Sequence, residues 1–145
     1  MSDRLVPSDI PWLERVAEIR VNCNLPSPSR NVAIARCWIE ETFFELFAIS
    51  GKTDRKGSVG LPKQVMFELL DPPPGHFRGL DSEYKLLEEI ASRYTQNKSI
   101  KGRIELFTER KPCLSCCYVI NQFRQAFPNI ELSILDTDVV QRRKG

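Results

Sequence analysis

The segment Pro112-Cys113-Leu114-Ser115-Cys116 constrains the fold of this chain more than any other, because it places two cysteines where the residue pattern changes. The alternation in 104–108 predicts a strand directly before it, and the apolar spacing in 113–127 predicts a helix directly after it. Two cysteines at C-x-x-C spacing can hold a soft divalent metal, for which zinc is the default, or can form a redox pair. The segment therefore predicts a strand–helix junction that carries a metal site or a reactive thiol pair.

A second polar segment, Asp81-Ser82-Glu83, begins another helical pattern. Apolar residues follow at intervals of three and four as far as Tyr94, which predicts an amphipathic helix that Asp81 or Ser82 can cap. Helix N-termini favour anions, so Asp81 and Cys113 are each helped into the ionised form that metal ligation requires. Glu83, two residues further on, could then move protons to and from a metal-bound water.

Composition favours a single globular domain over residues 1–145, with 41% hydrophobic and 28% charged residues. No run approaches the length of a membrane-spanning helix, and the first residues lack the apolar core of a secretory signal. The net charge of +2 argues only weakly for a nucleic-acid partner. Five cysteines in such a chain favour reduced thiols or a metal site over a disulfide framework, and we assign Cys23, Cys37 and Cys117 to the core.

The remaining patterns complete an α/β order. The expected elements are a helix over 10–21, strands over 32–39 and 43–49, a helix that follows Asp81 and ends before 97, a strand over 104–108, a helix over 113–127 and a strand over 130–135. The first two strands should form an antiparallel hairpin, and the last three elements a right-handed β-α-β unit with parallel strands. We expect the long loop 50–79 to form one wall of a cleft, and the tail 141–145 to be exposed and frayed. The result is a mixed sheet of four or five strands covered by helices.

Taken together, the two polar segments resemble the signature of zinc nucleobase deaminases, H-x-E followed by P-C-x-x-C, in which the glutamate is an acid and base rather than a ligand. The chain departs from this signature at Asp81, which stands in place of histidine, although zinc accepts an oxygen ligand. Zinc with three protein ligands and an open position lowers the pKa of bound water to about 7. Glu83 would pass the water proton to the ring nitrogen and leaving amine of cytosine, which yields uracil.

The chain also resembles the deaminase toxin domains of bacterial polymorphic toxin systems, within the cytidine-deaminase-like superfamily. The residues that carry this resemblance are Asp81-Ser82-Glu83, 107–116 and 122–129, with a looser likeness over 31–35 and 47–51. It implies a three-layer α/β/α fold with a zinc site at two helix N-termini. The implied ligands are Asp81, Cys113 and Cys116, with Glu83 as the proton shuttle. It further implies a secreted effector module of a longer protein, which acts in the target-cell cytoplasm and has a cognate immunity protein as partner.

Several residues near these segments are candidates for contacts with a substrate. Arg110 and Lys111 precede the cysteines, where they could contact phosphates. Basic residues of the long loop, Lys52, Arg55 and Lys56, could do the same. The basic residues of the tail, Arg142, Arg143 and Lys144, are weaker candidates. His76, the single histidine, lies on a Pro- and Gly-rich loop, and either replaces Asp81 as third ligand or stacks on a base. Asn31 either hydrogen-bonds a sugar or base or caps the first strand. The full set assigned to substrate binding is Asn31, Ser50, His76, Phe77, Arg110, Lys111 and Pro112.

These interpretations favour a zinc-dependent cytosine deaminase, a monomer with no membrane partner, that acts on nucleic acid. Single-stranded DNA is the favoured substrate because a base inside a duplex must first be flipped out; duplex DNA, RNA and a free nucleoside remain open. Two other classes are compatible with the cysteines: a thiol redox protein that uses Cys113 and Cys116, and a binding module whose structural zinc recruits His76 or Cys117.

Overall fold

The computed structural model of the 145-residue chain describes residues 9–26, 29–69, 81–112 and 114–143, with the backbone alone described at 114, 115 and 143. In chain order the elements within these ranges are α1 (Trp12–Asn22), β1 (Val32–Ile39), β2 (Thr42–Ile49), α2 (Ser82–Arg93), β3 (Gly102–Thr108), α3 (Leu114–Ala126), β4 (Ile130–Asp136) and α4 (Thr137–Arg143). The first seven elements follow the predicted order.

The strands form a mixed sheet in the order β2-β1-β3-β4. β1 pairs antiparallel with both β2 and β3, whereas β3 and β4 are parallel and joined through α3. The predicted hairpin and the predicted parallel pair are thus confirmed, with four strands in the described residues. Because β1 runs against its two neighbours, Val32 lies beside Ile49 and Ala33 beside Thr108. The start of β1 and the ends of β2 and β3 therefore meet at one end of the sheet.

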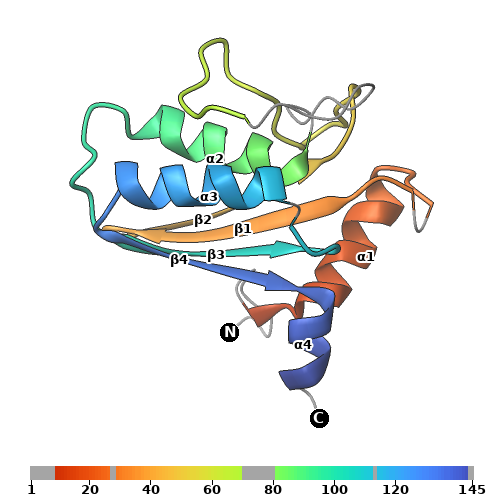
Figure 1. Cartoon of the computed structure of the whole chain (residues 1–145). Helices are drawn as coiled ribbons and strands as arrows, with labels where there is room; N and C mark the ends of the chain where they lie inside the picture. The colour runs from red at the N-terminus through yellow and green to blue at the C-terminus, as the bar shows by residue number, and fades with distance from the viewer. Residues whose placement is uncertain (1–8, 27–28, 70–80, 113, 144–145) are drawn as a thin grey trace.

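Helices cover both faces of the sheet, as expected. In Figure 1, α2 and α3 lie above the strands, while α1 and α4 lie on the opposite side. Alternate residues of β1 face opposite sides of the sheet. Ala33 and Ala35 belong to the core cluster between the sheet and helices α2 and α3, and Ile34 belongs to the cluster between the sheet and helices α1 and α4. Since both its faces are covered, β1 is buried along its length except for the half-buried Trp38.

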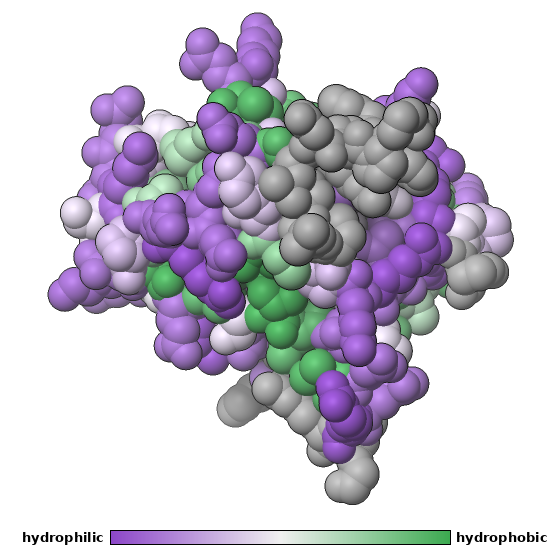
Figure 2. All heavy atoms as spheres, in the orientation of Figure 1, coloured by the Kyte–Doolittle hydropathy of each residue, from purple (hydrophilic) through white to green (hydrophobic). Residues whose placement is uncertain are grey.

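The surface in the same orientation is mostly hydrophilic. Figure 2 shows hydrophobic side chains gathered mainly in a strip that overlies β4 and extends toward α4. Helix α2 is buried on more than its predicted apolar face, because Ser82, Glu83, Lys85 and Glu88 are buried as well. In the described residues no helix combines the length and apolarity that a bilayer crossing requires.

Two expectations about the chain ends are corrected. The helix expected over 10–21 begins at Trp12, with Pro11 at its N-cap. The residues 141–143, which we expected to be frayed, belong to α4, because Val140 is buried in the second core cluster and Val139 packs against it. In the long loop, Phe67 belongs to the first core cluster.

Candidate active site

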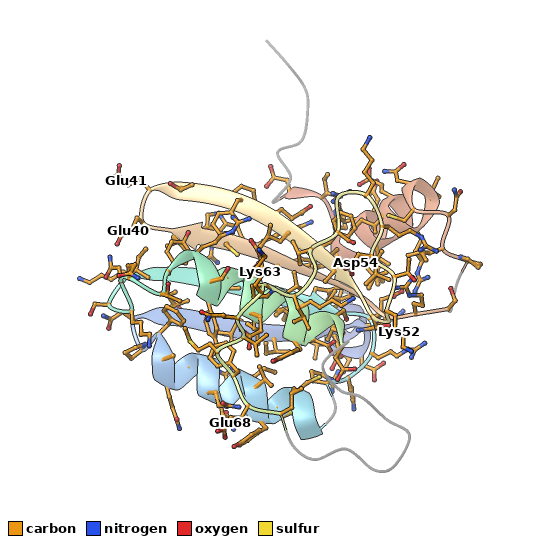
Figure 3. All side chains as sticks on the ribbon, turned by 90° about the horizontal axis from the view of Figure 1, so that it is seen from above. Glu40, Glu41, Lys52, Asp54, Lys63 and Glu68 are labelled. Atoms are coloured by element: carbon orange, nitrogen blue, oxygen red, sulfur yellow. The ribbon has the colours of Figure 1, made fainter. Side chains whose placement is uncertain are left out.

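A small cavity opens at the end of the sheet where β1 begins and β3 ends. Its volume is about 170 Å³, and its described lining residues are Asn31, Ser50, Asp81, Glu83, Arg110, Lys111 and Cys116. Figure 3 shows the labelled Lys52, just beyond Ser50, near this end of the sheet, and the turn residues Glu40 and Glu41 at the other. The two polar segments predicted to form one site therefore converge, although they lie on different helices.

The carboxylate of Asp81 and the thiol of Cys116 are neighbours, with 3.4 Å between Oδ2 and Sγ. Asp81 occupies the N-cap position of α2, yet its side chain makes no capping hydrogen bond; it is directed to α3 instead. Within the described residues, no group of three or more His, Cys, Asp or Glu side chains could hold a metal ion. Cys113 and His76, the other predicted ligands, lie outside those residues. The donor pair that is described, one thiol and one carboxylate, fits zinc.

Glu83 is buried, with 5% of its surface exposed, and each carboxylate oxygen accepts a hydroxyl hydrogen bond. Ser82 Oγ donates to Oε1 at 2.9 Å, and Thr108 Oγ1 donates to Oε2 at 3.3 Å. Burial raises the pKa of Glu83 above its ordinary range, and the nearby Asp81 carboxylate adds to this rise, while the two hydroxyl groups oppose it. The result is a carboxylate held in one orientation, with a raised pKa.

Asn31 organises these hydroxyl groups. Its Nδ2 donates to Ser82 Oγ at 2.7 Å and to Thr108 Oγ1 at 2.8 Å, and lies 3.4 Å from Glu83 Oε1. Its Oδ1 accepts the backbone N–H of Arg110 at 3.2 Å. Since Asn31 occupies one acceptor site on each hydroxyl, their hydrogens are left for Glu83. The Asn31 side chain thus supports Glu83, a role that sequence reasoning did not assign to it.

An ion pair fixes the polypeptide that enters this site. Arg20 of α1 donates to both carboxylate oxygens of Glu109, at 2.6 and 3.2 Å. The same guanidinium donates to the carbonyls of Pro26, Ser29 and Arg30, and Glu109 Oε1 accepts the backbone N–H of Val32 at 2.9 Å. Arg20 thus binds the residue before Asn31, and Glu109 binds the residue after it. The ion pair therefore fixes the backbone position of Asn31 at the cavity.

A second, more open cavity adjoins the first. It has a volume of about 400 Å³ and is lined by Lys111, Asp138, Gln141 and Arg142. Lys111 lines both cavities, and its Nζ lies 4.0 Å from Asp138 Oδ2, with both side chains well exposed. Basic side chains thus line both cavities, Arg110 and Lys111 in the smaller one and Lys111 and Arg142 in the larger one, alongside the carboxylate of Asp138.

The structure places the other predicted residues as follows. Arg110 and Lys111 line the cavity as expected, and so does Ser50; Pro112 is described but is not among the lining residues. His76 and Phe77 lie outside the described residues. Of the loop cations, Arg55 donates to the carbonyl of Cys23, and neither it nor Lys52 nor Lys56 lines the cavity.

Sequence reasoning missed Ser82 and Thr108, which are both fully buried beside Glu83. Only their positions in the sequence could have indicated a role in the site: Ser82 separates Asp81 from Glu83, and Thr108 ends the strand before the cysteines. The assignment of Cys117 to the core was wrong, because that side chain is exposed. Cys23 and Cys37 are buried, as predicted.

Comparison with known proteins adds a family to this geometry. A family model named Toxin-deaminase, described as the BURPS668_1122 family of deaminases, matches residues 17–138. The matched range contains all four described strands and every described residue that lines the smaller cavity. No curated protein matches the chain.

Proposed function

Because the chain belongs to the Toxin-deaminase family, the BURPS668_1122 family of deaminases, and is thus a hydrolytic deaminase of the toxin type, we propose that it converts cytosine to uracil in nucleic acid with the help of zinc. The observation that carries this proposal is the buried carboxylate of Glu83, which faces the same cavity as Asp81 and Cys116. The family match favours a deaminase over a thiol redox protein.

The described donors support zinc as the metal. Cys116 Sγ and Asp81 Oδ2 lie 3.4 Å apart, and each residue belongs to the first turn or cap of a helix. Together with Cys113, assigned by its spacing from Cys116, they would complete a set of three protein ligands. When bound there, zinc supplies a Lewis acid that makes water nucleophilic at neutral pH.

Glu83 is the general base and then the general acid. It accepts a proton from the attacking water, delivers it to the ring nitrogen N3 of cytosine, and helps to protonate the amine at C4 that leaves as ammonia. Its raised pKa suits this cycle, since a buried carboxylate takes up a proton more readily than an exposed one. Asn31, through Ser82 and Thr108, keeps the carboxylate in one orientation.

A polymer substrate is supported by the basic side chains that line the two adjoining cavities. A smaller cavity of about 170 Å³ suits one base, and Lys111 connects it to the second cavity with Arg142 on α4. Arg110, Lys111 and Arg142 are placed to neutralise phosphates on either side of an inserted nucleotide. Single-stranded DNA is the favoured form because a base that is already unpaired costs less to insert.

The family also supports the biological setting that we propose for this domain. A toxin deaminase would act as a secreted effector in the cytoplasm of a target cell, and a cognate immunity protein would restrain it in the producing cell. We propose that residues 1–145 form a single domain that acts as a monomer, with no membrane partner.

The test is to incubate the protein with single-stranded DNA, duplex DNA, RNA and free cytidine, and to measure conversion of cytosine to uracil. We expect the fastest conversion with single-stranded DNA, and conversion about 10²- to 10⁴-fold slower by the Glu83→Gln variant. If no substrate loses ammonia, cytosine deamination is wrong. If duplex DNA or RNA reacts fastest, the base chemistry stands and the choice of polymer changes.

A further inference from the structure

A buried lysine lies behind the rim of the cavity and takes no part in the chemistry derived above. Lys85 of α2 is only 2% exposed. Its Nζ donates to the carbonyls of Ile49 and Gly51 at 2.7 and 2.8 Å and to Asp54 Oδ1 at 2.8 Å. These three bonds use all the donors of an ammonium group. The lysine is therefore fully committed to the segment that follows β2.

The segment held by Lys85 contains Ser50, which lines the cavity. The two carbonyls that Lys85 binds, those of Ile49 and Gly51, flank Ser50. The carbonyl of Ser50 itself accepts a hydrogen bond from Nε of Arg30. Three successive backbone carbonyls are thus bound by two side-chain cations. Gly51 permits this, since its φ is +107° and a Cβ there would lie 3.0 Å from Arg30 Nε.

Ser50 in turn is bound to Asn31 by two hydrogen bonds. The backbone N–H of Asn31 donates to Ser50 Oγ at 2.8 Å, and the backbone N–H of Ser50 donates to the carbonyl of Asn31 at 2.9 Å. Because Asn31 orients the hydroxyl groups on Glu83, a shift of Ser50 would be transmitted to the catalytic carboxylate. The chain of contacts runs from Lys85 through Ser50 and Asn31 to Glu83.

We propose that Lys85 is a positioning residue for the deamination reaction, which fixes Ser50 and Asn31 at the cavity by binding the carbonyls on either side of Ser50. The expected effect on the rate of deamination rests on the proposed function, whereas the expected effect on the positions of Ser50 and Asn31 does not. Burial of an ammonium group is costly, and an apolar residue of similar size would often be as stable. Its use here is to fix the position of the backbone on either side of Ser50, by hydrogen bonds that an apolar residue could not make.

Glu88 provides a matched control on the same helix. It is also buried, at 1% exposed, and it also binds loop backbone, because it accepts the N–H groups of Met66 and Phe67 at 2.8 Å each. It does not line the smaller cavity. Loss of either charged group should disturb one loop, but only the loop held by Lys85 reaches Asn31 and Ser50.

The experiment compares wild type, Lys85→Met and Glu88→Gln by amide hydrogen exchange and by steady-state kinetics on a single-stranded oligonucleotide. We expect Lys85→Met to lose exchange protection at the Ser50 and Asn31 amides. Glu88→Gln, which keeps one acceptor oxygen, should lose it at Met66 or at Phe67. The kcat/KM of Lys85→Met should fall about 10- to 100-fold, the scale of one lost hydrogen bond to a charged group. Kinetics are compared at a temperature where each variant is folded.

Two results would overturn the inference: unchanged protection of Ser50 and Asn31 in Lys85→Met, or equal losses of kcat/KM in Lys85→Met and Glu88→Gln. If Lys85→Met does not fold, Asp54→Asn replaces it, because the Asp54 side chain is 41% exposed and lies outside the cavity lining. That variant should weaken protection at the same two amides. If the wild-type protein deaminates nothing, the proposed function fails, and the exchange data still decide whether Lys85 positions Ser50 and Asn31.

Discussion

The hydroxyl group of Thr108 lies 3.3 Å from Oε2 of Glu83, although 25 residues separate them in the chain. The same hydroxyl accepts a hydrogen bond from Asn31 at 2.8 Å, so its own hydrogen is left for the carboxylate. Thr108 is the last residue of β3 and Glu83 belongs to the first turn of α2. The end of a strand therefore controls the orientation of a carboxylate on a helix.

Thr108→Val should lower kcat while the fold is retained. The substitution conserves shape and removes the hydroxyl, so Oε2 of Glu83 loses one of its hydrogen bonds and the buried Asn31 Nδ2 loses an acceptor. A hydrogen bond to a charged group contributes roughly 1.5–3 kcal/mol, which corresponds to a loss of about 10- to 100-fold. Steady-state kinetics measure this loss. Thr42→Val, at an exposed position on β2, is the control and should keep the wild-type rate.

Glu83→Gln should separate metal binding from catalysis. The amide keeps the size of the side chain but cannot cycle a proton, and general acid–base catalysis contributes about 10²- to 10⁴-fold. We expect about one zinc per chain in both proteins, measured by elemental analysis, and a corresponding loss of uracil formation in the variant alone. Loss of zinc together with activity would instead assign Glu83 to the metal.

Cys116→Ala should lose zinc, whereas Cys117→Ala should keep it. The two cysteines are adjacent, but Cys116 is buried against Asp81 and Cys117 is exposed. A catalytic zinc site with one of three protein ligands removed binds its metal far more weakly. Zinc content after gel filtration checks both variants, and full metal retention by Cys116→Ala would contradict the proposed ligand set.

Arg142→Gln should weaken the reaction on an oligonucleotide more than the reaction on free cytidine. If Arg142 neutralises one phosphate of a single strand, its loss reduces the slope of log kcat/KM against log salt concentration by about 0.7. Kinetics over a range of salt concentrations measure the slope. Lys98→Gln removes the same charge from an exposed residue between α2 and β3, and should leave the slope unchanged.

Cys37 should make the protein less stable as the solution becomes alkaline. Burial raises the pKa of its thiol from 9.0 to about 12. The folded state therefore keeps the thiol proton over a range in which the unfolded state releases it, so stability falls as pH rises from about 9 toward 12. Between pH 8 and pH 10, wild type should lose about 1.4 kcal/mol more free energy of unfolding than Cys37→Ala. Urea unfolding at the two pH values measures the difference.

The parts of this fold that sequence predicted are those with a repeating pattern. The alternation in 104–108 and the three- and four-residue spacing after Asp81 gave β3 and α2, and the cysteine spacing located one half of the site. α4 was missed because its seven residues contain only two apolar side chains, Val139 and Val140, too few to show a period.

Individual side-chain roles were harder to predict, because they depend on contacts between distant segments. Lys85 falls in a helix of alternating charge and would normally face solvent, and only the fold shows that the segment after β2 surrounds it. Asn31 and Thr108 have side chains common at strand ends. Their connection to Glu83 depends on the antiparallel register of β1 and β3, which no local pattern specifies.

The bond network of Arg20 determines how far the domain can be trimmed. Its guanidinium binds Glu109 and the carbonyls that precede β1. Helix α1 therefore stabilises the end of the sheet at which the cavity lies. A shortened version that starts at Asn31 would keep every described cavity residue, yet the half-buried Glu109 carboxylate would lose its Arg20 partner and retain, of its described hydrogen bonds, only that from the N–H of Val32. The smallest active fragment should therefore include α1, although no residue of this helix lines the smaller cavity.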